Sequence, residues 1–130
     1  ISGGEETLMD KKVLIADDEQ NIVISLEFLM KREGYQVEVA NDGEEAVRRI
    51  RASRPDLVLL DVMMPKKSGF EVCQEVKSDP ALGGVRILML TAKGRDTEVA
   101  KGLALGADAY MTKPFSTREL VDKVRSMLEQ

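Results

Sequence analysis

The chain has 130 residues and a net charge of −4, with 43% hydrophobic and 32% charged residues. This size and balance suit one soluble globular domain with a single core, and no apolar run is long enough to cross a bilayer. The chain contains no histidine and one cysteine, which excludes histidine-based catalysis, imidazole metal sites and internal disulfides. The acidic balance, without a basic patch, argues against direct nucleic-acid binding.

The first ten residues, ISGGEETLMD, lack the apolar core of a secretory signal. We interpret residues 1–10 as a linker or a cloning-derived tail, with Met9 as a candidate native start. Residues 11–130 are expected to form a single domain. Since no signal or membrane segment is recognised, the expected location is the cytoplasm.

Five short apolar segments, rich in β-branched residues and leucine, predict β-strands. In chain order they are KVLIA (12–16), QVEVA (36–40), LVLLD (57–61), RILML (86–90) and AYMT (109–112). The first, third and fourth are almost wholly apolar, as expected for central strands of a parallel sheet covered on both faces. The second alternates apolar and polar residues, which favours the edge of the sheet.

Five segments with helical spacing alternate with these strands. In chain order, their predicted core-facing residues are Ile22, Leu26, Leu29 and Met30; Ala46, Val47 and Ile50; Val72, Cys73 and Val76; Val99, Leu103 and Ala104; and Leu120, Val124 and Leu128. Gly34, Pro55, Pro80 and Gly106 mark the ends of the first four helices, and residues 116–119 have a capping-box pattern at the start of the fifth. This alternation predicts an α/β fold with a doubly wound, five-stranded parallel sheet in the order 2-1-3-4-5, flavodoxin-like, with five helices.

Polar residues at the ends of the central strands point to a ligand site. They are Asp17 and Asp18 after the first strand, Asp61 at the third, Thr91 at the fourth and Lys113 at the fifth. Any one of these acids alone could be a turn residue or a helix cap. The carboxyl ends of neighbouring parallel strands meet in one crevice, however, so the side chains are expected to converge.

Clustered carboxylates repel one another, and a divalent cation such as Mg²⁺ resolves that conflict. A hydroxyl and an ammonium opposite the acids are the donors that phosphoryl oxygens require. The predicted crevice therefore suits phosphoryl transfer onto a carboxylate.

Four sequence blocks resemble the CheY-like receiver domains of response regulators in two-component signal transduction. They are VLIADDE, DLVLLDVMMPKKSGFEVC, ILMLTAK and GADAYMTKPF, in the family's order and spacing, and the resemblance covers residues 11–129. It implies a phosphorylation-activated signalling switch, and not an enzyme with a turnover substrate of its own. The implied phosphodonor is a histidine of a partner, either a sensor histidine kinase or a histidine phosphotransfer protein.

The resemblance also implies how the phosphoacceptor and the metal are held. Asp61 is the implied phosphoacceptor. The implied metal ligands are Asp17, Asp18, Asp61 and the backbone carbonyl of Met63. The implied ion is Mg²⁺, with Mn²⁺ as an alternative.

The remaining implied roles concern the response to phosphorylation. Thr91 and Lys113 would bind phosphoryl oxygens, Lys113–Pro114 would be a cis peptide, and Tyr110 would move inward as Thr91 shifts. The surface around the fourth helix, the fifth strand and the fifth helix would carry the output to an unidentified partner or effector domain. A monomer or a weak, phosphorylation-linked dimer is expected.

Two other readings of the same residues are weaker. A Mg²⁺-dependent phosphohydrolase with an aspartyl-phosphate intermediate, resembling haloacid dehalogenases, would need an acid two residues after the nucleophile, where this chain has Met63. A flavodoxin-like cofactor binder would need a phosphate-cradling loop after the first strand, where Asp17 and Asp18 would repel the cofactor's phosphate.

Overall fold

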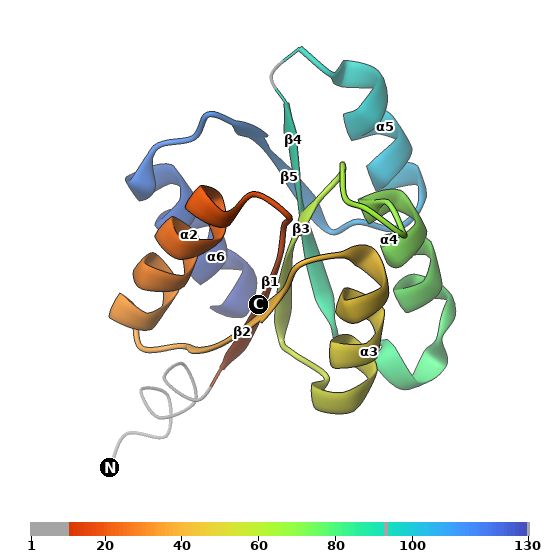
Figure 1. Ribbon diagram of the computed structural model, residues 1–130, viewed down its shortest axis with the longest axis horizontal. Coiled ribbons are helices and arrows are strands. Elements are labelled where there is room, and N and C mark those ends of the chain that lie inside the picture. Colours follow the sequence, from red (N-terminus) through yellow and green to blue (C-terminus); the bar gives the residue numbers. More distant parts are fainter. Residues whose placement is uncertain (1–10, 93, 130) are drawn as a thin grey trace.

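The computed structural model describes residues 11–92 and 94–129, which form a five-stranded parallel sheet with helices on both faces (Figure 1). The strand order is β2-β1-β3-β4-β5, so the predicted doubly wound topology is confirmed. The interpretation of residues 1–10 as a tail lies outside the described residues.

The five strands and five helices alternate along the chain as predicted. The strands are β1 (Lys12–Ala16), β2 (Gln36–Ala40), β3 (Leu57–Asp61), β4 (Arg86–Ala92) and β5 (Ala109–Lys113). The helices are α2 (Gln20–Arg32), α3 (Gly43–Ser53), α4 (Gly69–Ser78), α5 (Asp96–Ala104) and α6 (Thr117–Glu129), with the 3-10 helix η1 (Pro80–Leu82) after α4. β4 and β5 run further than predicted, so Thr91 and Lys113 lie within paired strands instead of after them.

The central strand β3 separates two apolar layers. All of its residues are buried, including the terminal Asp61. Leu57 and Leu59 face the layer that α2 and α6 cover, whereas Val58 and Leu60 face the layer of α3 and α4. The two pairs of helices lie on opposite sides of the sheet in Figure 1. A strand held on both faces in this way is a rigid support for the residue at its end.

The predicted core-facing stripe of α5 is wrong in part. Leu103 is 43% exposed and Ala104 is exposed, while Val99 is only half-buried. The buried residue of this helix is Gly102, where an added Cβ would lie 3.3 Å from the Cε atom of Met89. The helix therefore packs on the sheet through a glycine, which a search for apolar side chains at helical spacing does not detect.

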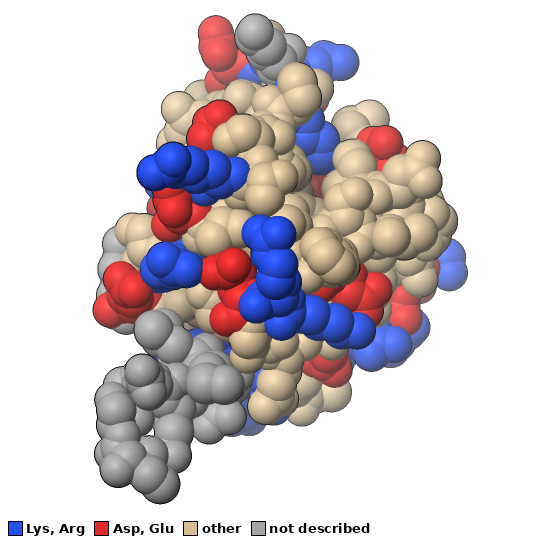
Figure 2. Space-filling model, turned by 90° about the vertical axis from the view of Figure 1, so that its left-hand side faces the viewer, with Lys and Arg blue, Asp and Glu red and all other residues tan. Residues whose placement is uncertain are grey.

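One face of the molecule carries charged side chains of both signs (Figure 2). On the face shown in Figure 2, acidic and basic side chains lie among one another and do not separate into a basic and an acidic half. Such a mixed face lacks the concentrated positive charge that a phosphate backbone attracts. None of the described helices is long and apolar enough to span a membrane.

Candidate functional site

The carboxyl ends of the central strands surround a cavity of about 290 Å³. Asp18 from the β1–α2 loop, Asp61 from β3, Thr91 from β4 and Lys113 from β5 all line it. The parallel sheet brings these residues together although they are up to 95 positions apart in the chain (113 minus 18). Side chains from four separate segments thus face one cavity.

Three carboxylates gather beside this cavity. Asp17, Asp18 and Asp61 each offer an oxygen atom, and these atoms lie within 4.8 Å of one another. Asp17 is fully buried, Asp61 is 7% exposed and Asp18 is exposed. The Oδ1 atom of Asp17 accepts a hydrogen bond of 2.9 Å from the backbone N–H of Glu19, which orients it. Closely spaced carboxylate oxygens with one open side suit a hard divalent cation such as Mg²⁺.

Lys113 supplies positive charge to the same cluster. Its Nζ atom lies 3.0 Å from Asp17 Oδ2 and 3.3 Å from Asp61 Oδ1. Burial opposes the charge on the ammonium, but the hydrogen bond to Asp17 and the nearby charge of Asp61 outweigh burial and raise the pKa of Lys113. Lys113 is therefore a fixed cation that contacts two of the three acids. The peptide bond that follows it, Lys113–Pro114, is cis.

Asp61 has the most perturbed carboxyl group of the cluster. Its burial and, second, the nearby charge of Asp17 raise its pKa to about 6. Contacts with Lys113 and a hydrogen bond from the backbone N–H of Met63 offset part of this effect. A carboxylate with an elevated pKa is more basic than an ordinary one, and a strongly shifted acid in a cavity is typical of functional sites.

The Thr91 hydroxyl is a buried polar group without a partner. The residue is 1% exposed, and within residues 11–92 and 94–129 no atom forms a hydrogen bond with its Oγ1 atom. Leaving a buried hydroxyl unpaired costs about 1–3 kcal/mol, so the group is poised to donate to an acceptor that enters the cavity. An anionic oxygen bound near Asp61 would be such an acceptor.

Two predicted residues differ in their relation to the cavity. Met63 lines it with a side chain that is 71% exposed, and its backbone N–H contacts the Asp61 carboxylate. Tyr110 lies elsewhere, 46% exposed, in a surface depression between α5, β5 and α6 that Leu103 and Glu119 also line. The structure therefore separates the aromatic side chain from the acidic cluster.

Two of the cavity-lining residues that sequence reasoning did not single out are charged, Arg95 and Glu98. Both line the cavity from the start of α5, and the Arg95 Nη1 atom lies 3.9 Å from Glu98 Oε2. Charged residues at the start of a helix are usually solvated, so the residue type alone does not indicate that Arg95 and Glu98 line a cavity. The only available clue was position, because a helix that follows β4 must begin beside the carboxyl end of that strand.

The comparisons with known proteins agree on one family. The family model described as the response regulator receiver domain matches residues 13–125. The chain is 47% identical over 122 residues to the alkaline phosphatase synthesis transcriptional regulatory protein PhoP of Bacillus subtilis. That match covers 94% of this chain and 50% of PhoP, so the chain spans about half the length of this relative.

Solved structures with the same fold come from different kinds of signalling protein. The chemotaxis response regulator CheY4 of Vibrio cholerae matches with a TM-score of 0.85 at 32% identity, covering 91% of this chain and 98% of CheY4. The receiver domain of a signal transduction histidine kinase from Syntrophus aciditrophicus matches with a TM-score of 0.85 at 33% identity, covering 92% of this chain and 90% of that one. The acidic cluster at the end of β3, the strand order and the family match agree: this chain belongs to the response regulator receiver domain family of two-component systems.

Proposed function

We propose that this domain is a phosphorylation-activated switch in which Asp61 accepts the phosphoryl group. One observation carries the proposal: the buried Asp61 carboxylate contacts the Lys113 ammonium in a cavity that the unpaired Thr91 hydroxyl also lines. A nucleophile, a fixed cation and a free hydrogen-bond donor are the groups that phosphoryl transfer onto a carboxylate requires. The domain is regulatory, and it turns over no separate substrate.

The proposed metal ligands are Asp17, Asp18, Asp61 and the backbone carbonyl of Met63, with Mg²⁺ as the ion and Mn²⁺ as an alternative. The clustered carboxylate oxygens support this choice, because such a donor set favours hard divalent cations. When bound, a divalent ion supplies charge neutralisation for the acids and for the transferred phosphoryl group.

The proposed reaction is an in-line displacement on a phosphohistidine of a sensor kinase or phosphotransfer protein. An Asp61 carboxylate oxygen attacks phosphorus, a P–O bond forms, and the P–N bond to the partner's imidazole breaks. The imidazole nitrogen leaves with the bonding electron pair and is protonated from solvent. Lys113 and Thr91 donate hydrogen bonds to the phosphoryl oxygens, which stabilises the charge during transfer.

The proposed switch follows from the added charge. A phosphoryl group brings close to two negative charges and three acceptor oxygens, and Thr91 must shift to reach one of them. Because Thr91 pairs with Thr112, which follows Tyr110 by two residues in β5, its shift is coupled to the exposed aromatic ring. The α5–β5–α6 surface then changes shape and controls an output partner or effector domain, with no direct nucleic-acid contact by this segment.

Intact-mass measurement tests the phosphoacceptor. Incubation with a small phosphodonor and Mg²⁺ is expected to add one phosphoryl group to the wild-type chain and none to Asp61→Asn. Asp122→Asn, which alters an exposed carboxylate on α6, serves as the matched control and should be phosphorylated normally. Absence of an adduct in the wild type, or an undiminished adduct in Asp61→Asn, would contradict the assignment.

Within residues 11–92 and 94–129, no structural feature favours the alternative function as a phosphohydrolase. The position two residues after Asp61 is Met63, whose side chain is apolar and 71% exposed and so supplies no proton to a leaving group. Release of phosphate from Asp61 would reset the switch.

A further inference from the structure

The loop between β3 and α4 carries the backbone that surrounds Asp61. It begins directly after Asp61, and the backbone N–H of Met63 donates to the Asp61 carboxylate. At its far end, the N–H of Gly69 donates to the carbonyl of Val62 over 2.8 Å. Any displacement of this loop therefore moves groups that touch the phosphoacceptor.

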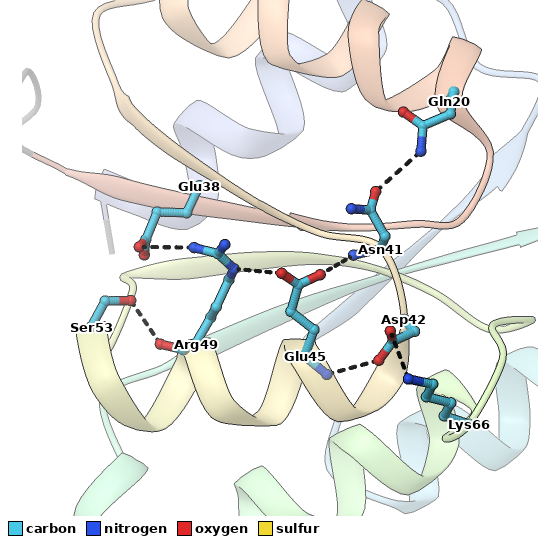
Figure 3. Close-up of polar contacts among 8 residues, drawn as sticks. All are labelled: Gln20, Glu38, Asn41, Asp42, Glu45, Arg49, Ser53 and Lys66. Carbon is cyan, nitrogen blue, oxygen red and sulfur yellow. Dashed lines mark hydrogen bonds and ion pairs between the residues drawn. The ribbon is translucent and has the colours of Figure 1, made fainter.

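A second loop, between β2 and α3, contacts the middle of the first. The backbone N–H of Gly43 donates to the carbonyl of Pro65 over 3.2 Å. Next to it, the Asp42 carboxylate faces the Lys66 ammonium at 3.8 Å, as Figure 3 shows. Two segments that are remote in sequence thus meet on the side of the site opposite to Lys113's strand, as the strand order β2-β1-β3-β4-β5 requires.

The approach of the two loops leaves no room for a side chain at position 43. A Cβ atom built on Gly43 would lie 2.5 Å from the Cβ atom of Lys67 and 2.7 Å from its carbonyl carbon, where real Cβ atoms keep at least 3.0 Å. Because the obstacle includes backbone, rotation of the Lys67 side chain cannot relieve the overlap. Gly43 is buried and begins α3, so it cannot easily move away.

Both loops are held firmly at this contact. Asp42 caps α3 by accepting a hydrogen bond of 2.8 Å from the N–H of Glu45, and Glu45 accepts one of 2.8 Å from the N–H of Asn41 (Figure 3). In the other loop, Lys66 has a φ angle of +70°, a left-handed conformation that costs a non-glycine residue about 1 kcal/mol. A strained residue of this kind persists only where its surroundings impose the conformation.

We propose that Gly43 is a positioning residue for the Asp61 site: its missing side chain lets the β2–α3 loop support the β3–α4 loop and so sets where the Met63 backbone lies. This inference rests on the proposed function, because Met63 matters through its carbonyl as a ligand of Mg²⁺ and through its N–H at Asp61. A Cβ at position 43 would push the β3–α4 loop outward and misplace the Met63 carbonyl relative to the three carboxylates.

The test compares Gly43→Ala with Gly84→Ala. The control adds the same methyl group at a glycine where nothing lies within 4 Å. Calorimetric titration of the whole chain with Mg²⁺ is expected to show affinity lowered about tenfold by Gly43→Ala, the loss typical of a disturbed ligand support, and unchanged by Gly84→Ala. The Mg²⁺ concentration for half-maximal phosphorylation of Asp61 should rise by the same factor, while the rate at saturating Mg²⁺ recovers.

Circular dichroism of each variant without Mg²⁺ separates positioning from simple loss of stability. A reduced folded fraction weakens the apparent Mg²⁺ affinity only in proportion to that fraction, so a tenfold loss in a variant that is almost wholly folded reports the site itself. Lys66→Gly provides a second variant in case Gly43→Ala does not fold. It accepts the positive φ angle without strain and creates no overlap, yet it loosens the same loop and removes the contact with Asp42. Its affinity for Mg²⁺ should fall in the same direction, by less.

The outcomes distinguish this inference from the proposed function. Unchanged Mg²⁺ affinity in the folded variants, with normal phosphorylation of the wild type, overturns the positioning role alone. A wild-type chain that binds Mg²⁺ but accepts no phosphoryl group overturns the proposed function, and calorimetry then decides on Gly43. A wild-type chain that binds no Mg²⁺ overturns both.

Discussion

The Asp61 carboxyl group combines burial with a neighbouring negative charge. Both raise its pKa, burial more than Asp17, to about 6. In the unfolded chain the group has the ordinary value near 3.8. Below that value both states are protonated and the burial of a charge costs nothing. As the pH rises through about 6, the folded state must hold a charged Asp61, so its contribution to stability is lost.

Replacing this carboxylate should therefore stabilise the metal-free protein at neutral pH. We expect Asp61→Asn to raise the free energy of unfolding by about 2 kcal/mol at pH 7.5, given a pKa shift of this size. The gain should shrink as the pH falls through 6 and vanish near pH 4. Urea unfolding of both proteins in the presence of a chelator measures it. An equal or lower stability of Asp61→Asn at pH 7.5 would show that burial of this charge is compensated in the native state.

Replacing Thr91, a buried group that is polar but neutral, should also stabilise the protein. Its hydroxyl is buried and unpaired within the part of the chain that the structure describes, so Thr91→Val, which keeps the shape, should raise the free energy of unfolding by about 1 kcal/mol. The same variant should be phosphorylated on Asp61 more slowly, because it lacks one donor to the phosphoryl oxygens, and should lose the response of Tyr110. Denaturant unfolding and amide NMR spectra measure the two effects. A destabilised Thr91→Val would mean that the hydroxyl has a partner, such as an ordered water.

At the scale of elements, β3 supports the site through its packing. Leu59 is fully buried in the layer of α2 and α6, two residues before Asp61. Truncation to alanine removes these contacts and leaves a cavity inside a close-packed layer.

Leu59→Ala should lower the free energy of unfolding by about 3 kcal/mol, a typical value for a large-to-small change in a core. Leu103→Ala on α5 is the matched control, and because its side chain is 43% exposed it should cost less than about 1 kcal/mol. Chemical denaturation compares the two variants. Equal losses would mean that α5 packs on the sheet through Leu103, as the sequence pattern alone predicts.

At the scale of the whole molecule, the acidic cavity and the α5–β5–α6 surface are joined through the β4–β5 ladder. Thr91 pairs with Thr112, and Tyr110, two residues earlier in β5, pairs with Met89. Under the proposed switch, a displacement of Thr91 would be transmitted to β5, because the hydrogen bonds of the ladder hold the two strands in register.

Beryllofluoride, a mimic of the phosphoryl group, should therefore change the spectrum on both sides of this ladder. With Mg²⁺ present, we expect shifts of amide signals at Thr91, Tyr110 and along α5 and α6. Asp61→Asn with the same additions should show none of these shifts. If the wild-type changes remained within the acidic cavity, the proposed coupling to the surface would be wrong.

The elements that could be predicted share one property, a pattern set by burial. Leu57–Leu60 is apolar at each position because both faces of β3 are covered, and that pattern is readable without a structure. Gly102 and Arg95 could not be predicted, because no burial pattern along the chain indicates their roles. A glycine in a helix interface and an arginine at a cavity rim have roles that depend on the neighbour they meet, and those neighbours come from other parts of the chain.

The sequence by itself determined the alternation of strands and helices, the doubly wound order and the polar residues at the strand ends, because hydrophobic periodicity and the handedness of βαβ crossovers are local rules. The tertiary structure alone decided which of those residues share one environment. The pKa of Asp61, the unpaired hydroxyl of Thr91 and the close approach at Gly43 each depend on distances of a few ångströms between remote segments. Burial and electrostatics act over such distances in space, and no pattern along the chain records them.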